Sequence, residues 1–359
     1  MSVYNGYKSP NFLKFKNKSI FNPLEEIDNK GLNLYEIYKN KKENKIYIAH
    51  TTTLKNVLNI YYLIDISKAE LYRSINSEKN FFQIKYHSID NKEYLISLTL
   101  DKLITVRDIN SNFSIINIIK TNYDYDLNEY SCYFLNLCDK ILFNKKYYNI
   151  LDNNTSLNSQ FKYVKDIIPW ENNDTLYIIQ KEKYEIKIYD TKNEDIIYKI
   201  IHKQLETRHL TDERYCTYHF DYFEMLLYNK KNKNYLFTSD RFGIIQVYDL
   251  NNFKYVHCIY GLECMHVDPY LEEERDELGY PNESHEVYIK FYLYNENYII
   301  FLKYERVTIF HDCSGASFMR KFNELYVFDV DAMKIISKYT DFEISDYEIK
   351  LMCMINNNS

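Results

Sequence analysis

The chain has 359 residues, 46% of them hydrophobic and 27% charged, a globular composition with enough residues for one large core or two ordinary ones. A net charge of −6 and a pI of about 5.9 argue against nucleic acid as the main partner, because phosphate binding needs a basic surface. The seven cysteines contain no C-x-x-C pair and indicate reduced thiols, and no apolar run approaches the roughly 20 residues of a membrane span. The N-terminus lacks an apolar signal core, so we expect a cytoplasmic or nuclear protein that is not secreted.

The first 31 residues contain one stretch, Asn11–Phe21, in which apolar and polar residues alternate as in a β-strand. In closed rings of sheets the two terminal strands often share one sheet, which removes exposed edges. We therefore interpret residues 1–31 as an N-terminal closing segment.

One pattern recurs between residues 32 and 341: an aspartate that follows a strand, with residues two and four places earlier on one side of that strand. These marker aspartates are Asp65, Asp108, Asp152, Asp190, Asp249 and Asp329. The first three spacings are 43, 44 and 38 residues, close to the roughly 40–45 residues of a propeller blade. The last two spacings, 59 and 80 residues, require insertions.

Four short strands with polar turns surround each marker, and Tyr235–Leu250 shows the rhythm best. Ile245 and Val247 alternate with polar or aromatic neighbours, and Asp240–Gly243 forms the preceding turn. Four strands per repeat predict an all-β fold, a β-propeller with six recognisable four-stranded blades in residues 32–341.

Two repeats depart from the rhythm. The third is the least regular, with strands expected at Cys132–Leu137, Ile141–Asn144, Tyr147–Leu151 and Phe161–Val164. In the sixth, Asp312 competes with Asp329 as the marker. We favour Asp329, because the strand Met333–Tyr339 follows it at the usual distance, and Val307–Phe310 then extends a long second strand.

The last segment, residues 342–359, contains Tyr347–Ile355, which is also strand-like. We interpret it as a C-terminal closing segment that pairs with the N-terminal one. The expected ring therefore has a seventh, composite blade.

The repeats resemble WD40 repeats in the third strand and its closing aspartate, as in Ile245–Leu250. The residue before that aspartate, usually Trp in the family, is here Ile64, Arg107, Leu151, Tyr189, Tyr248 or Phe328. The Gly-His pair that usually opens a repeat is absent, and the only tryptophan, Trp170, falls between the expected strands. The resemblance implies a scaffold that binds other proteins or peptides, without catalytic residues.

Three enlarged segments belong to one face of the expected propeller. The turn between the second and third strands of a blade and the connection to the next blade both emerge on that face. The three segments are Leu205–Arg214, Leu262–Ser284 and Asp312–Asn323. Long loops on a rigid scaffold often carry function. We therefore predict a binding surface around blades five and six, which includes Arg241 and His311.

The segment Leu262–Ser284 is strongly acidic, with Arg275 as its only Arg or Lys. Its predicted binding residues are Glu272, Glu273, Glu274, Asp276 and Glu277. Such a segment attracts a basic peptide by electrostatic steering. The alternative is a solvated insertion with no partner.

Cysteine and histidine side chains gather near residues 257–266 and 311–313, at His257, Cys258, Cys264, His266, His311 and Cys313. Their spacing matches no zinc finger or ribbon, so we predict no metal and no cofactor. Nothing in the sequence orients a Cys313–His311 pair for nucleophilic catalysis. The leading hypothesis is a non-catalytic interaction scaffold; the alternative is a hydrolase-like or metal-dependent enzyme that uses the central channel or the His311–Cys313 loop.

Overall fold

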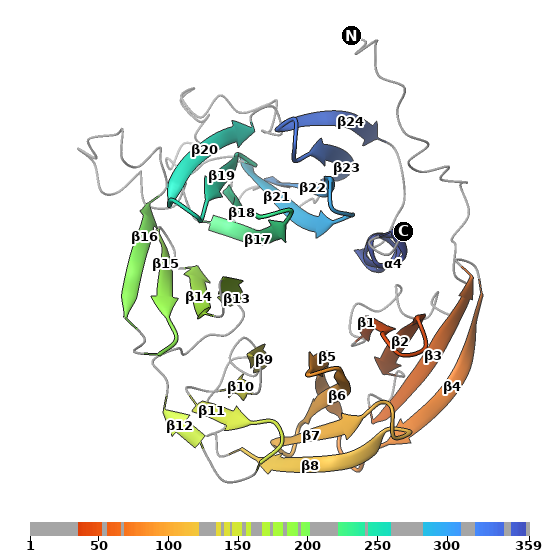
Figure 1. Ribbon diagram of the computed structural model, residues 1–359. Helices are drawn as coiled ribbons and strands as arrows, with labels where there is room; N and C mark the ends of the chain where they lie inside the picture. The colour runs from red at the N-terminus through yellow and green to blue at the C-terminus, as the bar shows by residue number, and fades with distance from the viewer. Residues whose placement is uncertain are drawn as a thin grey trace.

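The computed structural model describes residues 35–51, 56–65, 68–121, 134–137, 140–143, 146–152, 156–158, 167–172, 175–181, 185–192, 195–201, 222–240, 243–259, 283–309, 320–340 and 346–356. These residues form six four-stranded antiparallel sheets, each made of strands that follow one another in the chain. The sheets stand around a central axis as the blades of a β-propeller (Figure 1). The prediction of an all-β, propeller-like fold with four-stranded blades is confirmed.

Each blade takes its four strands from one continuous part of the chain. Blade one contains β1 (Tyr35–Asn40), β2 (Lys45–Thr51), β3 (Val57–Asp65) and β4 (Lys68–Asn76). Blade two contains β5 (Phe81–Ile89), β6 (Lys92–Thr99), β7 (Leu103–Asp108) and β8 (Ser114–Lys120). Blade three contains β9 (Phe134–Leu137), β10 (Lys140–Phe143), β11 (Lys146–Asn149) and β12 (Ser156–Asn158). Blade four contains β13 (Ile167–Asn172), β14 (Thr175–Lys181), β15 (Glu185–Asp190) and β16 (Ile196–Ile201). Blade five contains β17 (Tyr222–Lys230), β18 (Lys233–Asp240), β19 (Ile245–Asp249) and β20 (Lys254–Ile259). Blade six contains β21 (Glu283–Leu293), β22 (Tyr298–Ile309), β23 (Arg320–Asp329) and β24 (Lys334–Thr340).

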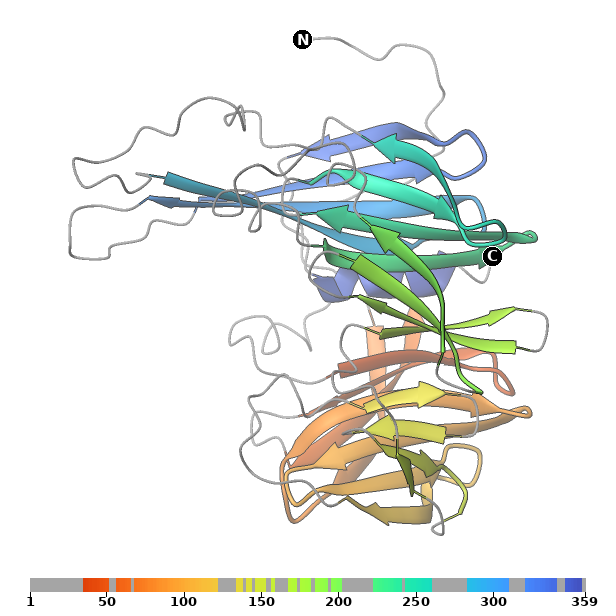
Figure 2. The same cartoon turned by 90° about the vertical axis from the view of Figure 1, so that its left-hand side faces the viewer.

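The antiparallel order gives the ring two distinct faces. The first and second strands of a blade, and its third and fourth strands, are joined at one end, which we call the hairpin face. The second and third strands, and successive blades, are joined at the other end, which we call the connection face. Figure 2 shows the ring from its side, with the connection face to the left.

Polar residues with positive φ close the hairpins in place of glycine. Asp90 and Asn91 (φ 46° and 63°) turn β5 into β6, and Lys231 and Asn232 (φ 53° and 60°) turn β17 into β18. Two successive residues with positive φ are the mark of the type I′ turn, whose twist matches that of the strands. These hairpin turns therefore do not depend on glycine, of which the chain has only 6.

The marker aspartates fix the turns after the third strands. In four blades the aspartate Oδ1 accepts a hydrogen bond from the backbone N–H two residues later. The pairs are Asp108–Asn110 (2.8 Å), Asp190–Lys192 (2.7 Å), Asp249–Asn251 (2.8 Å) and Asp329–Asp331 (2.9 Å). In the same blades a bulge in the third-to-fourth strand pairing directly precedes the aspartate. These four blades are thus copies of one unit down to the hydrogen bond.

Blade three differs from the prediction at two places. β11 ends at Asn149, whose Oδ1 accepts a hydrogen bond from the Leu151 N–H at 2.9 Å, so Asn149 holds the marker position and Asp152 lies beyond it. An asparagine oxygen accepts this bond as an aspartate oxygen does. The fourth strand is β12, which pairs with β11, whereas the expected strand Phe161–Val164 lies outside the described residues.

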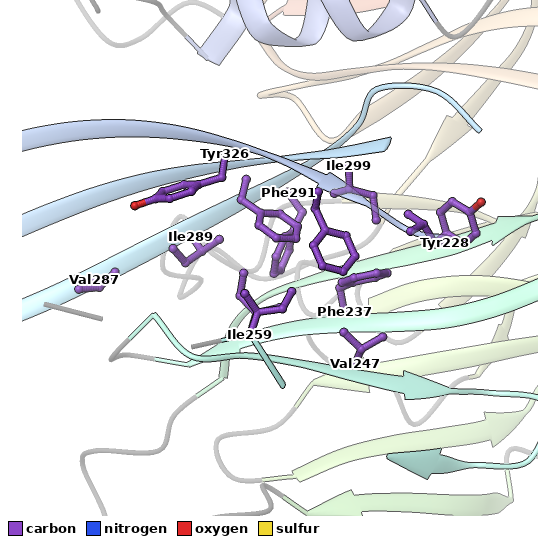
Figure 3. Close-up of a cluster of buried hydrophobic side chains, with 13 residues drawn as sticks. Tyr228, Phe237, Val247, Ile259, Val287, Ile289, Phe291, Ile299 and Tyr326 are labelled. Atoms are coloured by element: carbon purple, nitrogen blue, oxygen red, sulfur yellow. The ribbon is translucent and has the colours of Figure 1, made fainter. Parts of the chain in front are cut away.

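Blade interfaces hold the core. Each pair of consecutive blades shares a cluster of buried hydrophobic side chains. The cluster between blades five and six is the one drawn in Figure 3, where Phe237 of β18 meets the aromatic rings of blade six. Trp170 belongs to the cluster between blades four and five and is 1% exposed. It lies within β13, so its expected place between strands was wrong.

Residues 346–356 form the helix α4 (Asp346–Asn356), and the strand expected at Tyr347–Ile355 was wrong. The helix lies between blade six and blade one (Figure 1) and contacts both β21 and β1. Ile349 and Cys353 join a cluster with blade six, whereas Leu351 packs with Ile48 of blade one. A helix therefore occupies the position expected for a composite seventh blade; the N-terminal segment 1–31 lies outside the described residues, and its closing role stays a prediction.

Candidate functional site

The predicted binding residues lie outside the described residues: Glu272, Glu273, Glu274, Asp276, Glu277, Arg241 and His311. The strands that flank them are described. β20 ends at Ile259 and β21 begins at Glu283, while β22 ends at Ile309 and β23 begins at Arg320. These ends all lie on the connection face of blades five and six, which contact each other through β17 and β21. The structure thus fixes the attachment points of the acidic segment and of the 310–319 segment on one face of two neighbouring blades.

Blade six extends further from the connection face than the other blades do (Figure 2). Its strands β21, β22 and β23 have 11, 12 and 10 residues, whereas β17, β18 and β19 of blade five have 9, 8 and 5. We define the blade-six extension as residues 283–286, 305–309 and 320–323. It remains a paired sheet almost to its tip, with Glu283 opposite Ile309 and Val307 opposite Arg320.

The outer edge of the extension has no partner strand among the described residues. The pairing of β24 with β23 reaches only to Glu324 and Thr340, so the backbone of residues 320–323 is paired on one side, with β22. An unpaired edge presents N–H and C=O groups that an extended peptide uses to add a strand. The sequence of the extension contains three acidic residues, Glu283, Glu286 and Glu305, and three basic ones, Arg306, Arg320 and Lys321, so it carries no net charge.

Sequence reasoning identified only part of the extension. It predicted that Val307–Phe310 lengthens the second strand, and β22 does continue to Ile309. It assigned 320–323 and 283–284 to loops, and there it was wrong, because these residues pair in β23 and β21. The length of the strand-like run Tyr298–Ile309 was the available signal, since a long strand needs equally long neighbours to satisfy its backbone groups.

A charged cluster stands at the base of the extension. Lys303 is 6% exposed, and its Nζ lies 3.5 Å from Oε2 of Glu324, while Nζ of Lys338 lies 2.6 Å from Oε1 of Glu324. The Tyr326 hydroxyl donates a hydrogen bond to the same carboxylate at 2.5 Å. Burial alone would raise the pKa of Glu324, but the hydrogen bonds from Lys338 and Tyr326 and the charge of Lys303 bring it below its ordinary value. The Glu324 carboxylate thus links β22, β23 and β24 at the base of the blade-six extension.

Replacing Glu324 with Gln should lower the free energy of unfolding by about 2 kcal/mol at pH 7, because Lys303 then lacks its buried counter-charge. The folded-state pKa of Glu324 is depressed, so its contribution is complete above the unfolded pKa of about 4.3 and is lost as pH falls below that value. Urea unfolding of both proteins at pH 7 and pH 3 measures this. The exposed Glu78→Gln variant is the control; a Glu324→Gln deficit that persists undiminished at pH 3 would contradict the ionic explanation.

Within the described part of the chain, the cysteine and histidine side chains do not gather into a metal site. No group of three or more of their His, Cys, Asp and Glu side chains is placed to hold a metal ion. His257 and Cys258 occupy successive positions of β20, opposite Val247 and Gln246, and so lie on opposite faces of the sheet. Burial raises the pKa of the Cys353 thiol to about 12, which keeps it protonated. Cys264, His266 and the 311–313 loop lie outside the described residues, so the enzymatic alternative stays a prediction.

Within the described part of the chain, no helix has the length and apolar character needed to cross a membrane. The cellular compartment stays a prediction.

The comparisons with known proteins give a likeness to solved structures alone. No protein-family model matches the chain, and no curated protein matches it. Among solved structures the chain is similar to the crystal structure of Sqt1 from Saccharomyces cerevisiae, with 9% identity, a TM-score of 0.45, and coverage of 83% of each chain. A likeness of this size carries no argument about partners. The repeated blades and their aspartate turns support the description of the chain as a WD40-like β-propeller.

Proposed function

We propose that the protein is a non-catalytic protein–protein interaction scaffold whose partner docks on the connection face of blades five and six. The observation that carries this proposal is the blade-six extension, a paired sheet that continues beyond the ring with an outer edge that no described strand covers. Cross-strand pairing makes it rigid, and rigid elements bind with a smaller entropic cost than loops do. Sheet edges are a common site of peptide recognition.

The acidic segment supplies the second part of the proposal. It connects β20 to β21, so its two ends are anchored beside the extension. Five acidic side chains within residues 272–277 favour a basic segment of the partner, and a chain with a net charge of −6 attracts basic partners over some distance. The partner proposed is therefore a protein with a lysine- or arginine-rich segment.

A matched pair of charge-neutralising variants tests the location of this surface. Glu273→Gln with Asp276→Asn removes two charges from the acidic segment, and Asp90→Asn with Glu296→Gln removes two from the hairpin face. Asparagine tolerates the positive φ at position 90, so the control turn is preserved. We expect the first pair to weaken binding of a partner recovered by affinity capture about tenfold, and the control to leave it unchanged.

Cross-linking of the captured complex, read by mass spectrometry, gives the independent result. Links should fall at lysines of the connection face, such as Lys321 of the blade-six extension, and binding should weaken as salt rises. Two results contradict the proposal: links that gather on Lys41, Lys92 and Lys231 of the hairpin face, or equal losses in both variant pairs.

A further inference from the structure

A separate cavity lies on the hairpin side of the ring, where blade one, blade two and the end of α4 meet. Its volume is about 420 Å³, within the roughly 300–1,000 Å³ typical of small-molecule sites. It is lined by Ile37, Tyr38, Lys39, Lys41 and Asn44 of β1 and the following turn, Tyr86 of β5, and Met354 of α4. Because it lies away from the blade-six extension, it does not belong to the surface proposed above.

Aromatic stacking and hydrogen bonds fix the wall of the cavity. The rings of Tyr38 and Tyr86 are stacked, with centroids 4.9 Å apart and planes 8° from parallel. The Tyr86 hydroxyl donates to Oε1 of Glu93 at 2.8 Å, and the backbone N–H of Lys41 donates to the same oxygen at 2.8 Å. Glu93 is 1% exposed, so this junction between blades one and two is formed without any ligand. A preformed wall reduces the entropic cost of binding.

The polar groups that line the cavity are mostly hydrogen-bond donors. Lys41 Nζ donates to the neutral Ser88 hydroxyl at 3.0 Å, and no described carboxylate lies within ion-pair distance of Lys39 or Lys41. Asn44 adds an amide at the turn. Two lysines that have no ion-pair partner among the described residues favour an anionic ligand.

The remaining lining is apolar. Ile37, Tyr86 and Met354 contribute apolar surface to the lining. An inorganic anion would leave that surface uncovered, whereas an apolar body attached to the anionic group would cover it.

We propose that this cavity binds a small organic anion, with a carboxylate or phosphate group between Lys39 and Lys41 and an aromatic or aliphatic body against Tyr86, Ile37 and Met354. Two charge-assisted contacts orient the anionic group, and the apolar surface selects against inorganic anions. The site is on the opposite face from the partner surface, so the protein can hold both at once.

Binding of four simple probes to the full chain tests the proposal by NMR titration. Benzoate and phenyl phosphate represent the two anionic groups, benzyl alcohol lacks the charge, and inorganic phosphate lacks the apolar body. We expect benzoate or phenyl phosphate to bind with a Kd of about 1 mM, and benzyl alcohol and inorganic phosphate at least about tenfold more weakly. The better of the two aromatic probes identifies the anionic group.

Three variants locate the binding. Lys39→Met with Lys41→Met should weaken the aromatic anions by about tenfold or more, and Met354→Trp, which fills the cavity, should abolish their binding. Lys92→Met removes an exposed lysine from the same face and should change nothing. Thermal melting checks that every variant is folded. The proposal is overturned if benzyl alcohol binds as well as benzoate, if Lys92→Met weakens binding equally, or if neither aromatic anion binds at about 10 mM.

Discussion

Replacing Leu351 with Asp should lower the free energy of unfolding by about 3–5 kcal/mol, because it places a charge without a partner at the contact between α4 and blade one. Leu351 is 2% exposed and packs with Ile48, which is fully buried. Chemical denaturation followed by circular dichroism measures the loss. Hydrogen exchange should also accelerate in β1 and β2, which the helix covers, before it accelerates in blades three and four.

The control for this substitution is Lys350→Ala on the same helix. Lys350 is exposed, and its Nζ contacts the Tyr35 hydroxyl at 3.1 Å and its ring at 5.0 Å, interactions worth less than about 1 kcal/mol at a surface. A Leu351→Asp protein as stable as the control would show that α4 does not close the ring. In that case the gap between blades one and six would need another occupant.

The error over α4 has a physical origin in its two contacts. Ile349 and Cys353 face blade six, and Leu351 and Ile355 face blade one, so each pair has the i, i+4 spacing of a helix. Interleaved, the two pairs place apolar residues at every second position, which is the pattern of a strand. A helix that is buried on two sides cannot be distinguished from a strand by alternation, and only the tertiary arrangement decides.

The blades were predictable because their pattern is local. In blades two, four and five the strand alternation and the closing aspartate are set within one repeat, and the marker bonds to a backbone group two residues away. Blade three shows the limit. β12 is a three-residue strand, Ser156–Asn158, whose place is fixed by pairing with β11 and not by its own composition.

The residue before the marker aspartate, usually Trp in WD40 repeats, shows why the repeats match the WD40 pattern only in part. Arg107 stands before the marker Asp108 in blade two and is 8% exposed. Its Nη1 donates to the Ser97 hydroxyl at 3.0 Å, and burial lowers the pKa of its guanidinium. The Arg107–Ser97 pair thus forms a side-chain hydrogen bond between the third and second strands of blade two, at the position before the marker aspartate. The acidic segment of the candidate site has no such local rule, because charge runs specify neither a conformation nor a partner.

Phe237→Ala should lower the free energy of unfolding by about 3–5 kcal/mol, through lost burial and the cavity left behind. Phe237 is fully buried and carries the contact from blade five into blade six (Figure 3). Its ring centroid lies 6.5 Å from that of Phe291, 6.4 Å from that of Phe301 and 5.7 Å from that of Phe328. The remaining phenyl rings are held by their own strands, so the space cannot close fully. Equilibrium denaturation in urea measures the change.

Two further variants separate packing from general disturbance of blade five. Phe237→Leu keeps most of the volume and should cost no more than about half as much. Val256→Ala changes a residue of β20 that is 43% exposed, and it should remain within about 0.5 kcal/mol of the parent. Because the blade-six extension projects from the sheet that Phe237 supports, Phe237→Ala should also weaken partner binding on the connection face. Equal losses from Phe237→Ala and Val256→Ala would mean that the phenyl cluster does not hold these two blades together.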